Sequence, residues 1–218
     1  MKTLLKSAII AFALFFGHLF HGKAQSSLAM NVSKKLAAEK TYHIGKNSIL
    51  KLEGKTNVSG FTCDCNDNFP PQQFIVEGTN DGSLNTEFKL ASLKLKIKSL
   101  DCGNALMNKD LQKALNASTY PNITIELKKV EQAKCNRLTE LKDWVQMKAL
   151  IRITLNNVSK EYWLNITAKK SGPNQFRFIG SKSLKMTDFC VTPPVAMMGM
   201  IKVQDAITIN LDLEVTVE

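Results

Sequence analysis

The C-terminal part of the chain alternates strictly between apolar and polar residues. From position 207 to position 217 every odd-numbered residue is isoleucine, leucine or valine, and every even-numbered residue is polar. Because successive side chains of a β-strand point to opposite faces, this pattern predicts a strand with one buried face. Similar alternation recurs over residues 50–53, 93–98, 151–155 and 162–168. The sequence therefore predicts an antiparallel all-β fold.

Many strands with short connections must close or stack to hide their edges. We expect residues 41–218 to form one domain, an antiparallel β-barrel of about eight strands, whose interior has room for one small apolar ligand. Shorter strands are expected at residues 61–65, 74–76, 88–90, 176–178 and 184–186.

One stretch, residues 101–127, predicts a short helix between the strands. Asn108 is suited to cap its start, and Pro121 ends any helix, after which alternation resumes. An amphipathic helix inserted in an all-β chain usually closes one end of a sheet or barrel. The apolar residues at helical spacing are Met107, Leu111, Ala114 and Leu115.

The first residues indicate export from the cytoplasm. Lys2 and Lys6 precede an apolar run over residues 7–20, and small residues end at Ala24. This is the pattern of a signal peptide spanning residues 1–24, so we expect a periplasmic or secreted protein. The run is short for a permanent membrane anchor, the alternative explanation. The polar, alanine-rich residues 25–40 are expected to form a mobile lead-in or a short helix.

The chain is basic, with a formal net charge of +10. The predicted signal peptide contains three lysines and no acid, so the mature chain carries +7. The lysines of residues 93–98 alternate with apolar residues and are expected to form a solvated face or a protected strand edge. An anion-attracting stripe is the alternative. No aromatic residues are interleaved with them, so nucleic acid is not an expected partner.

Five cysteines follow the predicted signal peptide. In an oxidising compartment they are expected to form disulfides, and the odd number leaves at least one outside an intramolecular pair. Cys102 is expected to pair with Cys63 or Cys65, which lie two residues apart and face the same side of a strand. The candidates are Cys63, Cys65, Cys102, Cys135 and Cys190.

Few residues suit catalysis. After signal cleavage only His43 could serve as a histidine base, and its place in a predicted strand favours a plain structural role. No G-x-S-x-G, phosphate loop or H-E-x-x-H motif occurs. We therefore expect a protein that is not an enzyme and needs no cofactor.

Soft metal ligands are a second possibility. Cys63-Asp64-Cys65 lacks the spacing and partners of a zinc site. Met197, Met198 and Met200 could offer thioethers to copper(I). Methionines of this kind more often adapt to packing or to apolar ligands, and they follow Pro193-Pro194, which cannot form a regular strand. They favour the rim of an apolar pocket, or a loop packed over the barrel end.

Three segments together resemble the YceI-like family. They are Gly54-Lys-Thr-Asn-Val58 leading to Phe61-Thr-Cys63, Met107 to Ile123 with Tyr120-Pro121, and Leu184-Lys-Met-Thr-Asp-Phe189 with the double proline. The resemblance implies a lipocalin-like barrel, and the family includes polyisoprenoid-binding proteins of the bacterial periplasm. This chain departs from the family's pattern at Cys190, where members often carry glycine.

These observations lead to the hypothesis that the barrel binds an amphiphilic isoprenoid or similar lipid. Two alternatives are a barrel filled by its own side chains, with a structural or partner-binding role, and a metal handler. Oligomeric state is not predicted. The residues expected to contact the lipid tail are Phe61, Leu95, Ile97, Ile123, Ile125, Ile151, Phe178 and Ile209. The residues expected at the mouth are Met107, Leu111, Phe189, Met197 and Met198.

Overall fold

The computed structural model describes residues 36–78, 85–132 and 143–218. The predicted signal peptide therefore lies outside the described residues. The elements, in chain order, are β1 (Leu36–Ile44), β2 (Ile49–Thr56), β3 (Gly60–Cys65), β4 (Gln72–Gly78), β5 (Asn85–Lys89), β6 (Ser92–Lys96), the 3₁₀ helix η1 (Ile97–Ser99), β7 (Leu100–Asp101), α1 (Ala105–Ala114), β8 (Asn122–Gln132), β9 (Val145–Leu155), β10 (Val158–Gly172), β11 (Gln175–Lys185), the 3₁₀ helix η3 (Met186–Phe189), β12 (Val195–Ala196), the 3₁₀ helix η4 (Met197–Gly199) and β13 (Ile201–Val217).

Eight strands pair in a closed antiparallel ring. The order is β1, β4, β5, β8, β9, β10, β11 and β13, and β13 returns to β1. The closing contact is short and runs from the pair Tyr42–Val217 to the pair Ile44–Val215. The prediction of an antiparallel barrel of about eight strands is confirmed, although the barrel is irregular.

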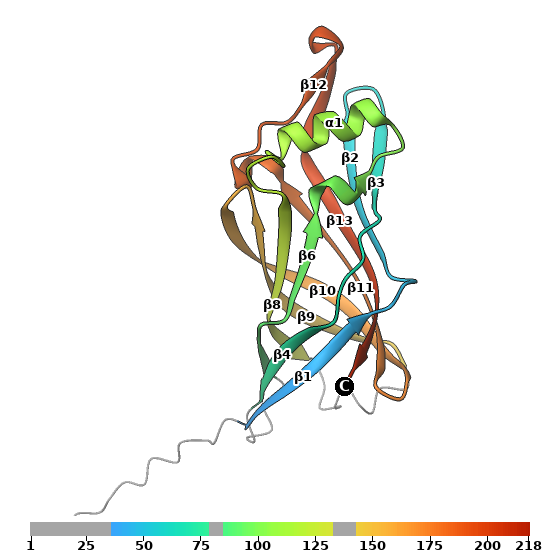
Figure 1. Cartoon of the computed structure of the whole chain (residues 1–218), viewed down its shortest axis with the longest axis vertical. Helices are drawn as coiled ribbons and strands as arrows, with labels where there is room; N and C mark the ends of the chain where they lie inside the picture. The colour runs from blue at the N-terminus through green and yellow to red at the C-terminus, as the bar shows by residue number, and fades with distance from the viewer. Residues whose placement is uncertain (1–35, 79–84, 133–142) are drawn as a thin grey trace, which may run out of the picture. The chain divides into compact units, whose positions relative to one another are not determined.

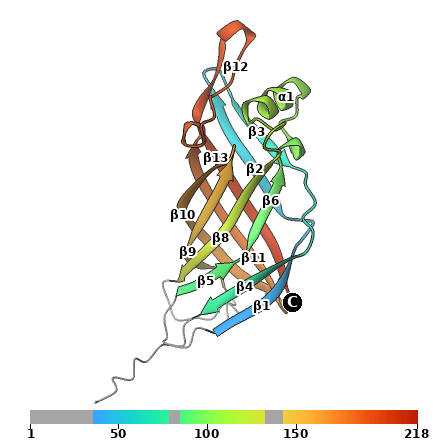
Figure 2. The ribbon, with the colours of Figure 1, turned by 60° about the vertical axis from the view of Figure 1, so that its left-hand side comes forward.

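Two long strands change partners along their length, which divides the barrel into two ends. Strand β8 pairs with β6 near its start and, after a bulge at Leu127–Lys129, with β5. Strand β13 pairs successively with β12, β2 and β1. At one end the wall is therefore built by β1, β4 and β5, and at the other by β2, β3 and β6 (Figures 1 and 2).

A second irregularity separates β10 from β11 toward the α1 end. Their pairing stops at Ile166–Gly180. Beyond that point the Lys182 ammonium donates a hydrogen bond of 3.0 Å to the carbonyl oxygen of Trp163, across the diverging strands. A side chain thus satisfies a carbonyl that the ladder no longer reaches.

Alternation along the strands matches the sequence prediction. Leu93, Leu95 and Ile97 are buried, and the lysines between them are exposed, as expected for a solvated outer face. The prediction for residues 25–40 is wrong at its end, because residues 36–40 belong to β1, where they pair with β4. Alternation there is weak, since Leu36-Ala-Ala-Glu-Lys40 offers little β-propensity.

Helix α1 lies across the end built by β2, β3 and β6 (Figures 1 and 2). Its N-cap is Asn104, whose side chain accepts hydrogen bonds from the backbone N–H groups of Leu106 and Met107 at 2.9 and 3.2 Å. The prediction that Asn108 caps the helix is wrong, because the helix begins one turn earlier. The helix also ends well before Pro121, at a left-handed Asn116 with φ of 52°.

A disulfide ties the start of the helix segment to the sheet. Cys63, fully buried on β3, is bonded to Cys102, which confirms the expected pairing of Cys102. Cys65 and Cys190 are free thiols, and Cys135 lies outside the described residues. The Asn108 side chain accepts from the Cys102 N–H at 2.7 Å and donates to the Asp101 carboxylate at 2.9 Å. These bonds fix the helix against β3 and β7.

Candidate functional site

An apolar cavity of about 420 Å³ lies under helix α1. Its walls come from α1, the β2–β3 hairpin, the end of β11 with η3, and the first half of β13. This volume is within the usual range of small-molecule sites. The cavity therefore belongs to the end of the barrel that the helix covers.

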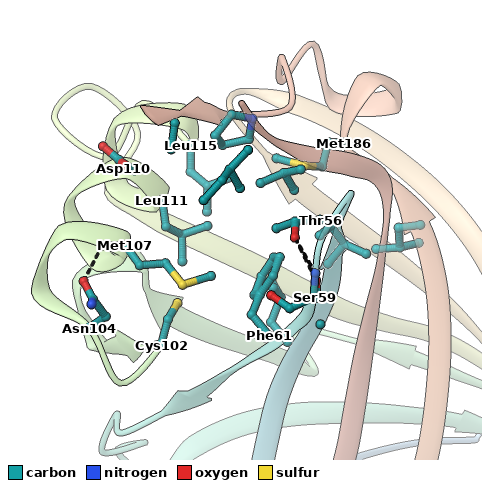
Figure 3. A pocket seen from close by; sticks show the side chains of 18 of the residues that line it. Thr56, Ser59, Phe61, Cys102, Asn104, Met107, Asp110, Leu111, Leu115 and Met186 are labelled. Atoms are coloured by element: carbon teal, nitrogen blue, oxygen red, sulfur yellow. Dashed lines mark hydrogen bonds between the residues drawn. The ribbon is translucent and has the colours of Figure 1, made fainter. Parts of the chain in front are cut away.

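The helix supplies one wall because its apolar side chains recur at helical spacing. Met107 and Leu111 point toward Phe61 of β3, and Leu115 lies deeper, near Met186 (Figure 3). Leu115 is almost fully buried, whereas Met107 and Leu111 keep partial exposure. The face predicted from the sequence is thus the face that lines the cavity.

The structure divides the residues predicted to contact a ligand into two groups. Four of the tail-contact candidates are instead buried in the core and do not line the cavity. They are Leu95, Ile97, Ile125 and Ile151. The candidates that do line the cavity are Phe61, Met107, Leu111, Ile123, Phe189, Met197 and Ile209.

Two further candidates lie elsewhere. Phe178 points inward from β11 but packs beside Phe176, with ring centroids 6.3 Å apart, outside the cavity lining. Met198 is fully exposed to solvent and does not line the cavity either. Met198 was expected at the mouth, and it belongs to a loop in which both Met197 and Met198 have positive φ angles.

Three aromatic side chains pack together toward the opposite end of the barrel. Tyr42 packs edge-on against Phe74, which stacks on Phe88, with centroid separations of 5.7 and 6.1 Å. The Tyr42 hydroxyl donates to the carbonyl oxygen of Ser92, and burial raises the pKa of this tyrosine. Its cross-barrel bond requires β1, β4 and β6 to come together, which sequence alternation alone does not reveal.

Polar groups are few around the cavity, and several of them already form hydrogen bonds within the protein. The Thr56 hydroxyl bonds within the β2–β3 turn, accepting from the backbone N–H of Ser59 at 2.9 Å (Figure 3). Asn104 caps the helix. Asp110 and Lys185 are the charged residues of the lining, one half-buried and one exposed. The cavity can therefore hold an apolar body and offers polar contacts mainly at its edge.

The segment before the double proline seals the cavity from below. Phe189 of η3 is buried, and Cys190 adopts a left-handed conformation with φ of 56°. That conformation favours glycine, which is the residue that the family resemblance led us to expect here. The Tyr162 hydroxyl donates to the Asp188 carboxylate at 3.2 Å, and burial together with that charge raises the pKa of Tyr162.

Among the described residues, no histidine lines the cavity. His43 lies near the end of β1, where its Nε2 atom is 3.3 Å from a Glu218 carboxylate oxygen. It does not line the cavity. Within the described parts of the chain, no cluster of three histidine, cysteine or acidic residues is arranged to hold a metal ion. The methionine copper site is not covered by that finding and stays a prediction.

Comparison with known proteins places this architecture in a family. A family model for the YceI-like domain matches residues 31–215, most of the chain. The chain belongs to the YceI-like family. No match to it is found among the curated proteins.

Two solved structures show the YceI-like fold at low sequence identity. A polyisoprenoid binding domain from Saccharophagus degradans, implicated in plant cell wall breakdown, has a TM-score of 0.57 and 9% identity, covering 81% of this chain and 98% of that domain. Burkholderia cenocepacia BcnA has a TM-score of 0.52 and 15% identity, covering 77% of this chain and 95% of its own. At these identities the likeness establishes the fold alone.

Several lining residues were missed by sequence reasoning. Their alternation predicts that they face the barrel interior. Alternation does not distinguish an inward side chain that packs in the core from one that lines a cavity. The missed residues include Leu52, Ile153, Leu155, Leu184, Met186 and Ile207. The position of α1 over the barrel end would have identified them.

Proposed function

We propose that the protein binds the apolar part of an amphiphilic lipid, of the isoprenoid class, in the cavity under α1, and that it performs no catalysis. The observation that carries the proposal is the apolar volume of about 420 Å³ enclosed by α1, β3 and β13. Burying a methylene contributes about 0.8 kcal/mol before the costs of association. A branched hydrocarbon of several isoprene units would therefore bind through shape and burial alone.

Support for the ligand class comes from relatives. The family resemblance points to polyisoprenoids, and a fold neighbour is described as a polyisoprenoid binding domain. A long tail would extend beyond the cavity, because its volume is only about 420 Å³ and Tyr42, Phe74 and Phe88 pack together toward the opposite end. We therefore expect the α1-end cavity to bind one segment of the ligand and its polar head to stay at the edge.

Export remains part of the proposal. A lipid carrier in the periplasm or outside the cell would suit the predicted signal peptide and the disulfide between Cys63 and Cys102. N-terminal sequencing of the mature protein should find Gln25 as the first residue. A mature chain that keeps residues 1–24 would contradict this part.

The test is uptake of an isoprenoid quinone, measured by native mass spectrometry, with organic extraction of the protein as purified. Leu111→Trp places a large ring in the cavity and should lower uptake at least about fivefold, since overpacking of this kind costs about 1–3 kcal/mol. Ile179→Trp, on the outer face of β11, is the matched control and should leave uptake unchanged. Equal uptake by both variants, or none by the wild type, would refute the proposal.

A further inference from the structure

Large apolar side chains are exposed around the opening of the cavity. They come from three separate segments: the β2–β3 turn, the first turn of α1, and the loop around β12 and η4. We call them the apolar rim. Its members are Val58, Leu106, Val195, Met197, Met198 and Met200.

Three of the six rim residues line the cavity, and the other three belong to the same loop as Met197. Val58, Leu106 and Met197 all line the cavity, and all three are more than half exposed to solvent. Figures 1 and 2 show α1, the β2–β3 hairpin and β12 at the same end of the barrel. The cavity therefore opens to solvent through a ring of exposed hydrocarbon and thioether groups.

Hydrogen bonds hold this loop arrangement in place. Asn57, next to Val58, donates from its side chain to the carbonyl oxygen of Met200 at 2.9 Å and accepts from the N–H of Lys202 at 2.8 Å. Its backbone N–H also donates to the carbonyl oxygen of Lys202 at 3.0 Å. Positive φ angles at Met197 and Met198 turn the loop so that Met198 is fully exposed. These bonds fix the loop against the β2–β3 turn and so present the exposed side chains together.

The three segments that carry the rim are basic. Residues 55–61, 104–116 and 192–204 contain four lysines and one aspartate, a net charge of +3. All four lysines are exposed, and the aspartate, Asp110, is half-buried at the cavity. Basic side chains beside exposed apolar ones match the surface of an anionic bilayer, where lysines meet head groups and apolar side chains enter the acyl boundary.

We propose that the apolar rim docks the protein reversibly onto an anionic lipid bilayer, with the opening of the cavity facing the membrane. None of the helices in the described parts of the chain has the length and hydrophobicity of a membrane span. Flexible, unbranched methionines suit a fluid surface because they adapt to irregular apolar contacts. The docking goes beyond the lipid binding proposed above, and it is tested without any ligand in the cavity.

The test is sedimentation with vesicles of phosphatidylethanolamine and phosphatidylglycerol at low salt. The double variant Val58→Asp/Met198→Asp places two carboxylates in the rim and should lower partitioning at least about tenfold, because charge is unfavourable at the acyl boundary and lysine attraction is weakened. Leu90→Asp is the matched control: Leu90 is 67% exposed, like Val58 at 68%, and lies in the β5–β6 turn outside the rim. It should sediment as the wild type does.

Two further readouts separate this contact from others. Partitioning of the wild type should fall in high salt and on phosphatidylcholine vesicles, since part of the attraction is electrostatic. Thermal unfolding of all variants checks that the fold is kept, and isoprenoid uptake from detergent reports on the cavity separately. No sedimentation of the wild type, or equal sedimentation of the wild type and the double variant, would overturn the docking proposal. Uptake could fail while sedimentation persists, which would refute the lipid-binding proposal alone.

Discussion

Gly54 provides a sharp test of how the cavity wall is packed. It lies on β2, directly opposite Phe61 of β3 and close to Ile207 of β13. A Cβ atom at this position would lie 2.7 Å from Cε1 of Phe61, still closer to its Cζ, and 2.9 Å from Cδ1 of Ile207. The Phe61 ring therefore occupies the space that any other residue at position 54 would need.

Replacing Gly54 with alanine should force the Phe61 ring out of place and into the cavity. Overpacking of a core site costs about 1–3 kcal/mol, and the lower entropy of the unfolded alanine chain offsets about 0.4–1 kcal/mol. We expect a net loss of about 1–2 kcal/mol in the free energy of unfolding, or about 2–8 °C in Tm for a domain of this size. Uptake of an isoprenoid should fall as well, because the displaced ring takes up cavity volume.

Urea unfolding of four proteins isolates the contact: the wild type, Gly54→Ala, Phe61→Ala and the double variant. Gly54→Ala should cost less in the Phe61→Ala background, with a coupling of at least about 0.5 kcal/mol. Gly60→Ala is the matched control, because its nearest neighbour for an added Cβ is the Gly54 carbonyl oxygen at 3.7 Å. It should leave stability unchanged or slightly raised. Strict additivity of the two substitutions would refute the reasoning.

Three other predictions concern the elements that hold the cavity in place. Replacing Cys63 and Cys102 with alanine should cost about 4 kcal/mol in urea unfolding, since the disulfide spans 39 residues of the chain. The Thr187 hydroxyl donates to Asp205 at 2.7 Å and, with the Thr187 N–H, holds the pKa of Asp205 below its usual value. The stability that this lowered pKa contributes is fully present above the unfolded pKa of about 3.9 and is lost as pH falls through the folded pKa. The Thr187→Val variant should therefore lose less stability than the wild type as the pH is lowered. Asn57→Ala removes two side-chain hydrogen bonds and should cost about 1–3 kcal/mol, with faster hydrogen exchange in residues 195–203.

Each of these predictions has a contradicting result. A urea midpoint of the double alanine variant equal to that of the oxidised wild type would mean that the disulfide adds no stability. Parallel acid titrations of the wild type and the Thr187→Val variant would mean that the Thr187 hydroxyl does not influence Asp205. Normal hydrogen exchange in the Asn57→Ala variant would mean that the methionine loop is held by other contacts.

Alternation predicted the barrel well because it reports a local property, the side of a strand on which each residue lies. Residues 93–97 face as the pattern predicts, whereas residues 208–217 are all half-buried and show no alternation in burial. The start of β1 was missed because Ala37 and Ala38 carry little β-propensity, and its place depends on pairing with β4. The N-cap of α1 was misplaced because Asn104 and Asn108 are both capable caps, and anchoring of Cys102 by the disulfide favours the earlier one.

The site was only partly predictable, for a physical reason. Inward residues such as Leu95 and Ile151 become core because strands stand opposite them, whereas Phe61 and Leu111 face a space that the helix spans without filling. Whether an inward side chain packs against other residues or lines a cavity depends on contacts between segments far apart in the sequence. The alternation of apolar and polar residues does not encode those contacts. Met198 illustrates the same limit, since left-handed backbone angles at the loop decide its exposure.

The most direct measurement of the central claim is photo-crosslinking with an isoprenoid analogue that carries a diazirine in its tail, followed by peptide mass spectrometry. Crosslinks are expected on Phe61, Met107 and Leu111, which line the cavity under α1. Crosslinks confined to the end near Phe74 and Phe88, or to the outer strand faces, would contradict binding in this cavity.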